Sequence, residues 1–367
     1  MKRYNQVGLL YFIIHFLVEI TSFYVLTSYF STPIVWGLCL LYDSLAFVPQ
    51  GFFGFLRDKG IRVNFAVLGT VLTSLSLVLL HFDVNAIIVI ISVALGNCLV
   101  HIHGAELTLR SSPGKIAPSA VFVAGGSFGV VTGKLLSTHG VAVPWILTLN
   151  LLTFIPIFIA EKLKAGDGEE NLKEYHFSNE KINGVAVVLL ATFVVIVRAY
   201  MGYGIPTTWN KTELQTVLLY CSMGVGKGLG GILADKIGIR LTALISTVGA
   251  LPFMIFGAEQ MEISLIGVAL FSMTMAVTLA LIVSRLRHFP GIAFGFTTVG
   301  LFAGSLPFFF YRVQSVTVND IIITLLTVPC VVILWIICAK PKKKPSDQTA
   351  IPEETESLQT VKKENDI

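Results

Sequence analysis

Charged side chains are scarce in this chain. Asp, Glu, Lys and Arg make up 13% of its 367 residues, whereas hydrophobic residues make up 54%. The mean hydropathy is +0.79. A soluble protein of this length could not bury so much apolar surface in its core. The composition therefore predicts a protein that resides in a lipid bilayer.

Cysteines and soluble segments are also few. The five cysteines all lie inside apolar runs, where we expect inert thiols rather than disulfides. No expanded soluble loop and no nucleotide-binding segment stands out, which argues against a pump driven by ATP. We expect neither an enzyme nor a nucleic-acid-binding protein, and no cofactor or bound metal.

Apolar segments long enough to cross a bilayer dominate what is present. A helix needs about 20 apolar residues to cross a hydrocarbon core about 30 Å thick. Twelve such segments can be drawn: 7–29, 33–54, 62–80, 85–108, 115–137, 140–160, 182–205, 213–233, 240–257, 261–284, 290–310 and 318–339.

Positive charges alternate between the loops of these segments. Loops on one side carry nearly all the lysines and arginines, and loops on the other side carry only Lys211 and Arg312. Cytoplasmic loops are the ones enriched in Lys and Arg. The pattern predicts a multi-pass protein of the plasma or inner membrane with both termini in the cytoplasm.

The longest polar interruption divides the membrane region almost in half. We expect an N-terminal six-helix bundle over 1–160, a cytoplasmic linker over 161–181 and a C-terminal six-helix bundle over 182–339. Residues 340–367 begin with a lysine cluster and continue as a polar run, which predicts a disordered cytoplasmic tail. We expect a monomer.

Two motifs repeat with one spacing. Gly54-Phe-Leu-Arg-Asp58-Lys59 and Gly231-Ile-Leu-Ala-Asp235-Lys236 lie 177 residues apart. Arg110-Ser-Ser-Pro-Gly114 and Arg287-His-Phe-Pro-Gly291 have the same offset. Six helices separate the copies, so the two halves have the same orientation in the membrane. Such parallel repeats are typical of transporters built from two related bundles.

The first of these motifs resembles the signature loop of the major facilitator superfamily. The second copy reads Gly231-x-x-x-Asp235-Lys236-x-Gly238-x-Arg240, and the first copy, from Gly54 through Asp58 and Lys59 to Arg62, is one residue shorter. The resemblance implies an all-α membrane protein of twelve helices in two parallel-repeat bundles that works by alternating access. It also implies that the motif latches cytoplasmic helix ends together. The plainer alternative is a turn with solvated charges.

The first half is also similar to the fosmidomycin-resistance type of drug exporter. The similarity lies in His15-Phe-Leu-Val-Glu19, His103-Gly-Ala-Glu106 and the glycine-rich run from Gly125 to Gly133. That subgroup commonly has Asp at the first acid and a Pro after the second His, and this chain has neither. The resemblance implies a proton-coupled antiporter for efflux of a drug-like or anionic organic compound.

Two carboxylates fall near the middle of expected spans. Glu19 lies about 18 Å into its helix and Asp43 about 15 Å at 1.5 Å per residue. A charge there is costly unless it faces a cavity or a partner. Removal from water favours the protonated form, so Glu19 and Asp43 are candidates for reversible protonation, with His15 one turn from Glu19. A structural hydrogen bond is the alternative for each.

Other ionisable side chains are candidates for solute binding. Arg198 and Lys227 lie too deep to reach water by extending their stems, and either could hold an anion or neutralise an acid. His103 shares a helix face with Glu106, so the two could form a gate pair or reach interfacial water. His101 and His103 point to different faces, which argues against a metal pair on that helix.

Three functions remain open at this point. The leading hypothesis is a proton-coupled secondary transporter of a small solute. A facilitator or importer of a metabolite, in which the acids are structural, is the second. A transport-inactive membrane sensor or scaffold is the third.

Overall fold

The computed structural model describes residues 2–163, 168–204, 212–257, 259–311, 313 and 315–339. These residues are almost entirely helical, and the only β contact among them is an isolated bridge between Ser178 and Cys338. The expected tail over 340–367 lies outside the described residues.

Helices occur at each of the twelve expected segments. The first half contains α1 (Arg3–Thr27), α2 (Val35–Phe47), α3 (Gln50–Asp58), α4 (Phe65–His81), α5 (Ala86–Arg110), α6 (Ala117–Thr138), α7 (Val143–Leu151) and α8 (Phe154–Leu163). A short α9 (Gly168–Lys173) follows. The second half contains α10 (Gly184–Gly204), α11 (Glu213–Lys236), α12 (Ile239–Thr247), α13 (Leu251–Phe256), α14 (Met261–Ser272), α15 (Thr274–Val283), α16 (Pro290–Ser305), the 3₁₀ turn η1 (Leu306–Phe309) and α17 (Val316–Ile337).

Several expected spans are broken into two helices in sequence. Within the described residues, eleven stretches are long and apolar enough to cross a membrane when such pairs count as one, and α4 is a shorter apolar helix. Prolines lie at three of these breaks: Pro49 caps α3, Pro252 opens α13 and Pro307 lies in η1. A proline interrupts a helix because it lacks a backbone donor and clashes with the preceding turn.

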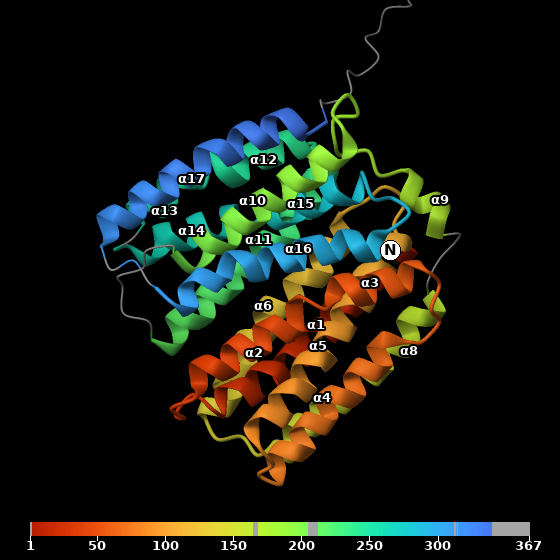
Figure 1. Cartoon of the computed structure of the whole chain (residues 1–367), viewed down its shortest axis with the longest axis vertical. Helices are drawn as coiled ribbons and strands as arrows, with labels where there is room; N and C mark the ends of the chain where they lie inside the picture. Colours follow the sequence, from red (N-terminus) through yellow and green to blue (C-terminus); the bar gives the residue numbers. More distant parts are fainter. Residues whose placement is uncertain are drawn as a thin grey trace, which may run out of the picture.

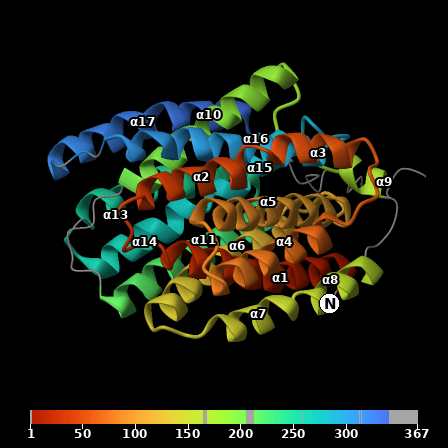
Figure 2. The same cartoon turned by 60° about the horizontal axis from the view of Figure 1, so that its bottom comes forward.

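The helices form two bundles that lie side by side (Figure 1; Figure 2). Helices α1–α8 make one bundle and α10–α17 the other. The most extensive packing between them is that of α6 against α11 and of α3 against α16. The N-terminus and α9 lie at the same end of the molecule, which we call the linker end, and the opposite end is called the open end.

Backbone contacts between glycines bring the bundles together at the linker end. A Cβ atom on Gly54 of α3 would lie 2.4 Å from the carbonyl oxygen of Gly291 in α16. A larger side chain is also excluded at Gly291, because a Cβ atom there would lie 2.5 Å from the Gly54 carbonyl oxygen. Gly231 of α11 has the same role, with its Cβ position 2.3 Å from Cβ of Ala120 in α6. Small residues let these helix backbones touch.

The segment after α9 bonds to both bundles. The buried Tyr175 hydroxyl donates to the carbonyl oxygens of Leu109 and Lys115 in the first half, at 3.2 and 3.0 Å. Burial raises the pKa of this phenol, so the hydroxyl keeps its proton. The Phe177 backbone N–H donates to the Ser284 hydroxyl in the second half at 2.9 Å. The linker is therefore a strap across the linker end.

Asn150 of α7 holds three helices of the first bundle together. Its side chain is fully buried, donates to the Ser74 hydroxyl of α4 at 2.9 Å and accepts from the Thr21 hydroxyl of α1 at 3.1 Å. Thr73 of α4 bonds to the same amide.

We expect Asn150→Ala to lower the free energy of unfolding by about 1–2 kcal/mol, because interhelical hydrogen bonds in membrane proteins average about 0.6 kcal/mol and the partners would stay buried. Thermal unfolding in detergent measures the effect. Thr148→Ala is the control, since Thr148 is exposed and bonds only within α7. Equal melting temperatures for the two variants would contradict this role.

Candidate functional site

The Asp58 carboxylate at the end of α3 bonds to the other bundle. Its oxygens accept from the backbone N–H groups of Gly291 and Ile292, at 3.0 and 2.9 Å. These groups are at the start of α16, where unpaired N–H groups and the helix dipole favour a negative charge. The side chain is fully shielded from solvent. Asp58 thus caps a helix of the opposite half.

Asp235 at the end of α11 makes the mirror contact. Its two carboxylate oxygens accept from the N–H groups of Ile116 and Ala117, at 3.1 and 3.0 Å, at the start of α6. The two repeats therefore cap each other reciprocally. We call the Asp58 and Asp235 contacts together the paired caps.

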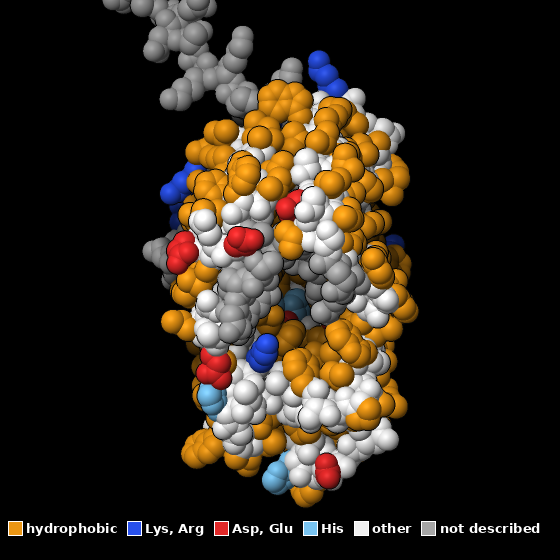
Figure 3. All heavy atoms as spheres, turned by 90° about the vertical axis from the view of Figure 1, so that its left-hand side faces the viewer, with side chains coloured by type: hydrophobic (Ala, Val, Ile, Leu, Met, Phe, Trp, Pro, Cys, Tyr) orange, Lys and Arg blue, Asp and Glu red, His pale blue; other side chains and the backbone are white. Residues whose placement is uncertain are grey.

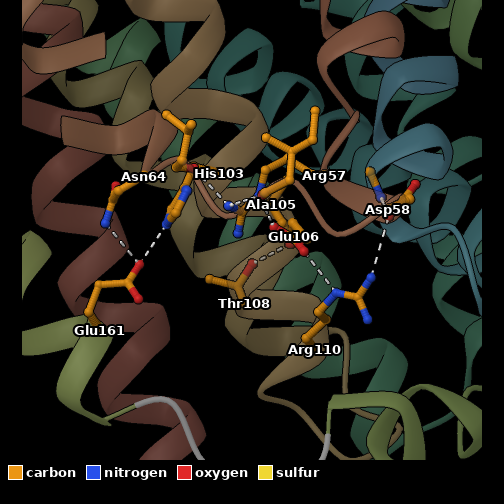
Figure 4. Close-up of polar contacts among 12 residues, drawn as sticks. Arg57, Asp58, Asn64, His103, Ala105, Glu106, Thr108, Arg110 and Glu161 are labelled. Carbon is orange, nitrogen blue, oxygen red and sulfur yellow. Dashed lines mark hydrogen bonds and ion pairs between the residues drawn. The ribbon is translucent and has the colours of Figure 1, made fainter. Parts of the chain in front are cut away.

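A network of buried charges supports the first cap (Figure 4). Glu106 of α5 accepts from the Arg57 Nε at 2.6 Å and from the Arg110 Nε at 2.9 Å. Arg110 also reaches Asp58, with its Nη2 3.6 Å from the carboxylate. Glu106 is buried, so two guanidinium groups are needed to compensate for its removal from water. The network fixes the end of α3 against α5.

His103 lies next to this network but faces away from the other bundle (Figure 4). Its Nε2 is 2.7 Å from a carboxylate oxygen of Glu161 in α8, which also accepts from Asn64. The idea that His103 and Glu106 form a pair or reach interfacial water is wrong, because both are buried and each has a different partner. Its contacts with Glu161 and Tyr11 are both within the first bundle.

The remaining residues of the two motif copies are either exposed or part of a turn or helix contact. Lys59, Arg62 and Lys236 are exposed. Gly238 has a φ of 91°, a left-handed conformation that favours glycine at the turn into α12. Arg240 donates to the Trp335 carbonyl oxygen at 2.7 Å and stacks on its ring, which joins α12 to α17.

The open end of the molecule is hollowed between the two bundles. Figure 3 looks onto this end, and histidine and acidic side chains are visible at the floor of the hollow, in pale blue and red. At the linker end the paired caps join the two bundles instead.

A buried cluster of three ionisable side chains lies deep in the first bundle. The Nε2 atoms of His15 and His101 are each 3.5 Å from the same carboxylate oxygen of Glu19. The ligand atoms of the three residues all lie within 4.8 Å of one another. We call this the His–Glu–His cluster. It could hold a metal ion, and sequence reasoning missed it because His101 comes from α5 whereas the other two come from α1.

Further hydrogen bonds orient the cluster. The Nδ1 atom of His15 is 2.9 Å from the Phe122 carbonyl oxygen, and that of His101 is 2.9 Å from the Asn97 carbonyl oxygen. The Asn97 amide donates to the Glu19 carboxylate at 3.0 Å. The rings and the carboxylate therefore have few alternative positions.

One cation of the second bundle approaches the cluster, and a second lies close to the first. The Lys227 ammonium of α11 donates to the Ser127 hydroxyl of α6 at 2.8 Å, and it interacts electrostatically with Glu19 and Arg198. Arg198 lines a small, mostly apolar cavity inside the second bundle. Its Nε has no hydrogen-bond partner among the described residues. The structure thus brings Lys227 to the first bundle and leaves Arg198 behind it.

Asp43 of α2 has different surroundings from Glu19. It is half-buried, and no described residue forms a hydrogen bond or ion pair with it. Glu19 acts on it electrostatically, and Asp43 in turn acts on Cys39 and Tyr42. Of the two carboxylates predicted near mid-membrane, Asp43 is therefore the one without a partner in the described part of the chain.

The chain is similar to known proteins in three-dimensional structure. No family model and no curated protein matches the sequence. A bacterial homologue of the iron transporter ferroportin, in an outward-facing state, is 11% identical with a TM-score of 0.58 over 92% of this chain and 98% of its own. The fucose:proton symporter of E. coli is 13% identical with a TM-score of 0.64, and the match covers 90% of this chain and 97% of the symporter. The human organic anion transporter MFSD10 is 14% identical with a TM-score of 0.61, and the match covers 89% of this chain and 99% of that transporter.

The chain has the major facilitator fold. Its all-α architecture, with twelve apolar segments in two bundles, confirms the fold class expected from the sequence. The chain is a multi-pass membrane protein. In this fold the paired caps occupy the junction between the two bundles, and the hollow opens between the same bundles at the other end.

We expect Asp58→Asn to open the linker end, because the neutral amide interacts less well with the start of α16. A carboxylate at a helix N-terminus contributes about 1–2 kcal/mol in a partly buried setting, which corresponds to roughly a 5- to 30-fold change in the ratio of closed to open molecules. Spin labels at exposed positions 62 and 288, on a background without cysteine, should report a new population at longer distance.

Asp83→Asn is the matched control. Asp83 is exposed at the open end and has a φ of 56°, which asparagine tolerates. The role of the cap would be refuted by distance distributions that are the same in Asp58→Asn and the unmodified chain.

Proposed function

We propose that the chain is a secondary transporter that moves a small solute by alternating access. The observation that carries this proposal is the asymmetry of the junction: the paired caps join the bundles at the linker end, while a hollow with a polar floor opens between them at the other end. Releasing the caps would allow the bundles to close over the hollow and open on the opposite side. Binding at a midplane site between two repeats fits this cycle.

The proposed membrane is the plasma or inner membrane, with the linker end in the cytoplasm. The excess of Lys and Arg in the loops at that end supports this orientation. The chain would work as a monomer, since the solute path lies between its own two bundles.

The proposed solute is a small organic anion or a drug-like compound that carries an acidic group. Lys227 supports this choice, because its ammonium lies at the junction between the bundles and donates to Ser127 across it. Arg198 adds a second positive charge nearby. Carboxylates and phosphates form charge-assisted hydrogen bonds with such groups, and these are roughly twice as strong as neutral ones.

The proposed coupling ion is the proton, and Asp43 is its carrier. A half-buried carboxyl group without a partner in the described residues can gain and lose a proton without breaking a salt bridge. The uncharged form costs less to enclose when the hollow closes. Glu19 and His15, which the sequence groups with Asp43, lie instead in the His–Glu–His cluster.

The proposed direction is export by proton antiport. The similarity of the first half to fosmidomycin-resistance-type exporters supports this direction. Import by symport is the second candidate, because structures of similar fold include a fucose:proton symporter and a proton:xylose symporter.

A panel of organic anions and neutral drug-like compounds, tested on reconstituted vesicles with and without an imposed pH gradient, tests the function. We expect at least one anion to accumulate against its gradient only when the pH gradient is present. Asp43→Asn should abolish this accumulation yet retain exchange of labelled for unlabelled solute, because exchange needs no net proton movement.

Asp43→Glu is the control variant, since it keeps a carboxyl group and should retain part of the pH-driven accumulation. Absence of any flux would contradict transport itself. Full pH-driven accumulation by Asp43→Asn would remove Asp43 from the coupling step and leave the transport proposal standing.

We further expect Lys227→Gln to weaken binding of the transported anion about 10- to 100-fold, because hydrogen bonds to charged groups contribute about 1.5–3 kcal/mol. Glutamine can still donate to Ser127, so the loss reports the charge. Equilibrium binding of labelled solute to purified protein gives the affinity. Lys134→Gln, a half-exposed lysine on α6, should bind normally, and equal affinities for the two variants would disprove the assignment.

A further inference from the structure

We infer that the His–Glu–His cluster is a binding site for a divalent first-row transition-metal ion, with the Nε2 atoms of His15 and His101 and the Glu19 carboxylate as ligands. Neither solute recognition by Lys227 nor proton carriage by Asp43 uses this cluster. It is the only group of three potential metal ligands within reach of one another in the described residues.

The tautomers of the two histidines support metal binding. A backbone carbonyl oxygen only accepts hydrogen bonds, so each Nδ1 next to Phe122 or Asn97 must carry the proton. In the neutral ring the lone pair then lies on Nε2, and both Nε2 atoms are the ones that face Glu19. Two lone pairs directed at a carboxylate repel it unless a proton or a metal ion lies between them.

The spacing of the ligand atoms also favours an ion over direct hydrogen bonds. Each Nε2 lies 3.5 Å from the Glu19 oxygen, which is longer than the 2.7–3.2 Å typical of hydrogen bonds. Ligands about 2.0–2.1 Å from a tetrahedral zinc-like ion lie about 3.3 Å from one another. Imidazole with a single carboxylate is a donor set that suits Zn, Fe, Co and Ni rather than Mg or Ca.

The surrounding residues hold the ligands in place, as expected of a metal site. Metal-binding histidines usually donate their other N–H to a carbonyl oxygen or carboxylate, and bound carboxylates are themselves hydrogen-bonded. Here the carbonyl oxygens and the Asn97 amide supply these contacts. Gly126 of α6 makes room for the ring, because a Cβ there would lie 2.4 Å from His15 Cε1 and Nε2.

Charge indicates what else the ion would bind. Lys227 interacts electrostatically with Glu19 and His101, so a bare divalent ion would add positive charge next to an ammonium. Three protein ligands leave at least one coordination position open. An anionic solute that fills this position and pairs with Lys227 would relieve the repulsion. This last step rests on the proposed anionic solute, whereas metal binding itself does not.

Cobalt(II) is the probe that tests the site, because its visible absorption depends on its ligands. Purified tag-free protein, stripped with a chelator and carrying no cysteine, is titrated with CoCl₂ in detergent. We expect saturable absorption with one equivalent per chain. His101→Gln and Glu19→Gln should weaken binding at least tenfold, and Gly126→Ala should weaken it or shift the spectrum while leaving all three ligands in the chain.

His103→Gln is the matched control, since it removes a buried histidine two residues away on the same helix and should bind cobalt normally. Asp43→Asn should also bind normally, although it loses pH-driven transport, so this result separates the two proposals. Absence of saturable absorption in the cysteine-free protein would overturn the inference. Equal cobalt affinities for His101→Gln and His103→Gln would overturn it as well. If a ligand variant misfolds, the comparison of Gly126→Ala with the unmodified site decides the question, because that variant keeps all three ligands.

Discussion

The cost of burying a charge without a partner organises the structure. At the linker end three shielded acids have partners: Asp58 and Asp235 accept from two backbone N–H groups each, and Glu106 accepts from two arginines. Nearer the middle of the bundles, Asp43 and the Arg198 Nε have no hydrogen-bond partner among the described residues. Satisfied charges hold the bundles together. Incompletely satisfied charges need a proton, an ion or a solute, and they lie where the proposed transport cycle would use one.

The two halves share the caps but not the central chemistry. One repeat length after His15, Glu19 and His101 the chain has Thr192, Ile196 and Thr278. One repeat length before Lys227 and Arg198 it has Gln50 and Thr21. Both halves need the same device to close a common junction, so the caps are symmetric. The proposed solute is asymmetric, and the acids and histidines of one bundle opposite Lys227 of the other would give it two different surfaces.

The sequence predicted the features that depend on local pattern. Twelve apolar segments, the repeat and the acids that end α3 and α11 all follow from spacing along the chain. It could not predict contacts between distant helices. His101 joins Glu19 across 82 positions of sequence, and His103 bonds to Glu161 at the start of the expected linker. Periodicity on one helix shows which side a residue faces but not what lies there.

Helix α6 connects the closure of the linker end to the centre of the molecule. Asp235 of α11 caps its first turn, and Ser127, near its middle, accepts from Lys227 of the same α11. On its other side, a Cβ on Gly126 would strike His15 and a Cβ on Gly129 would lie 2.7 Å from Glu19 Cβ. A rotation of α11 that releases the cap must therefore also move Lys227 relative to α6 and to the cluster behind it. Because transitions of this kind rotate whole domains as rigid bodies about their interface, opening of the linker end and a change in the electrostatic surroundings of the cluster would be one event.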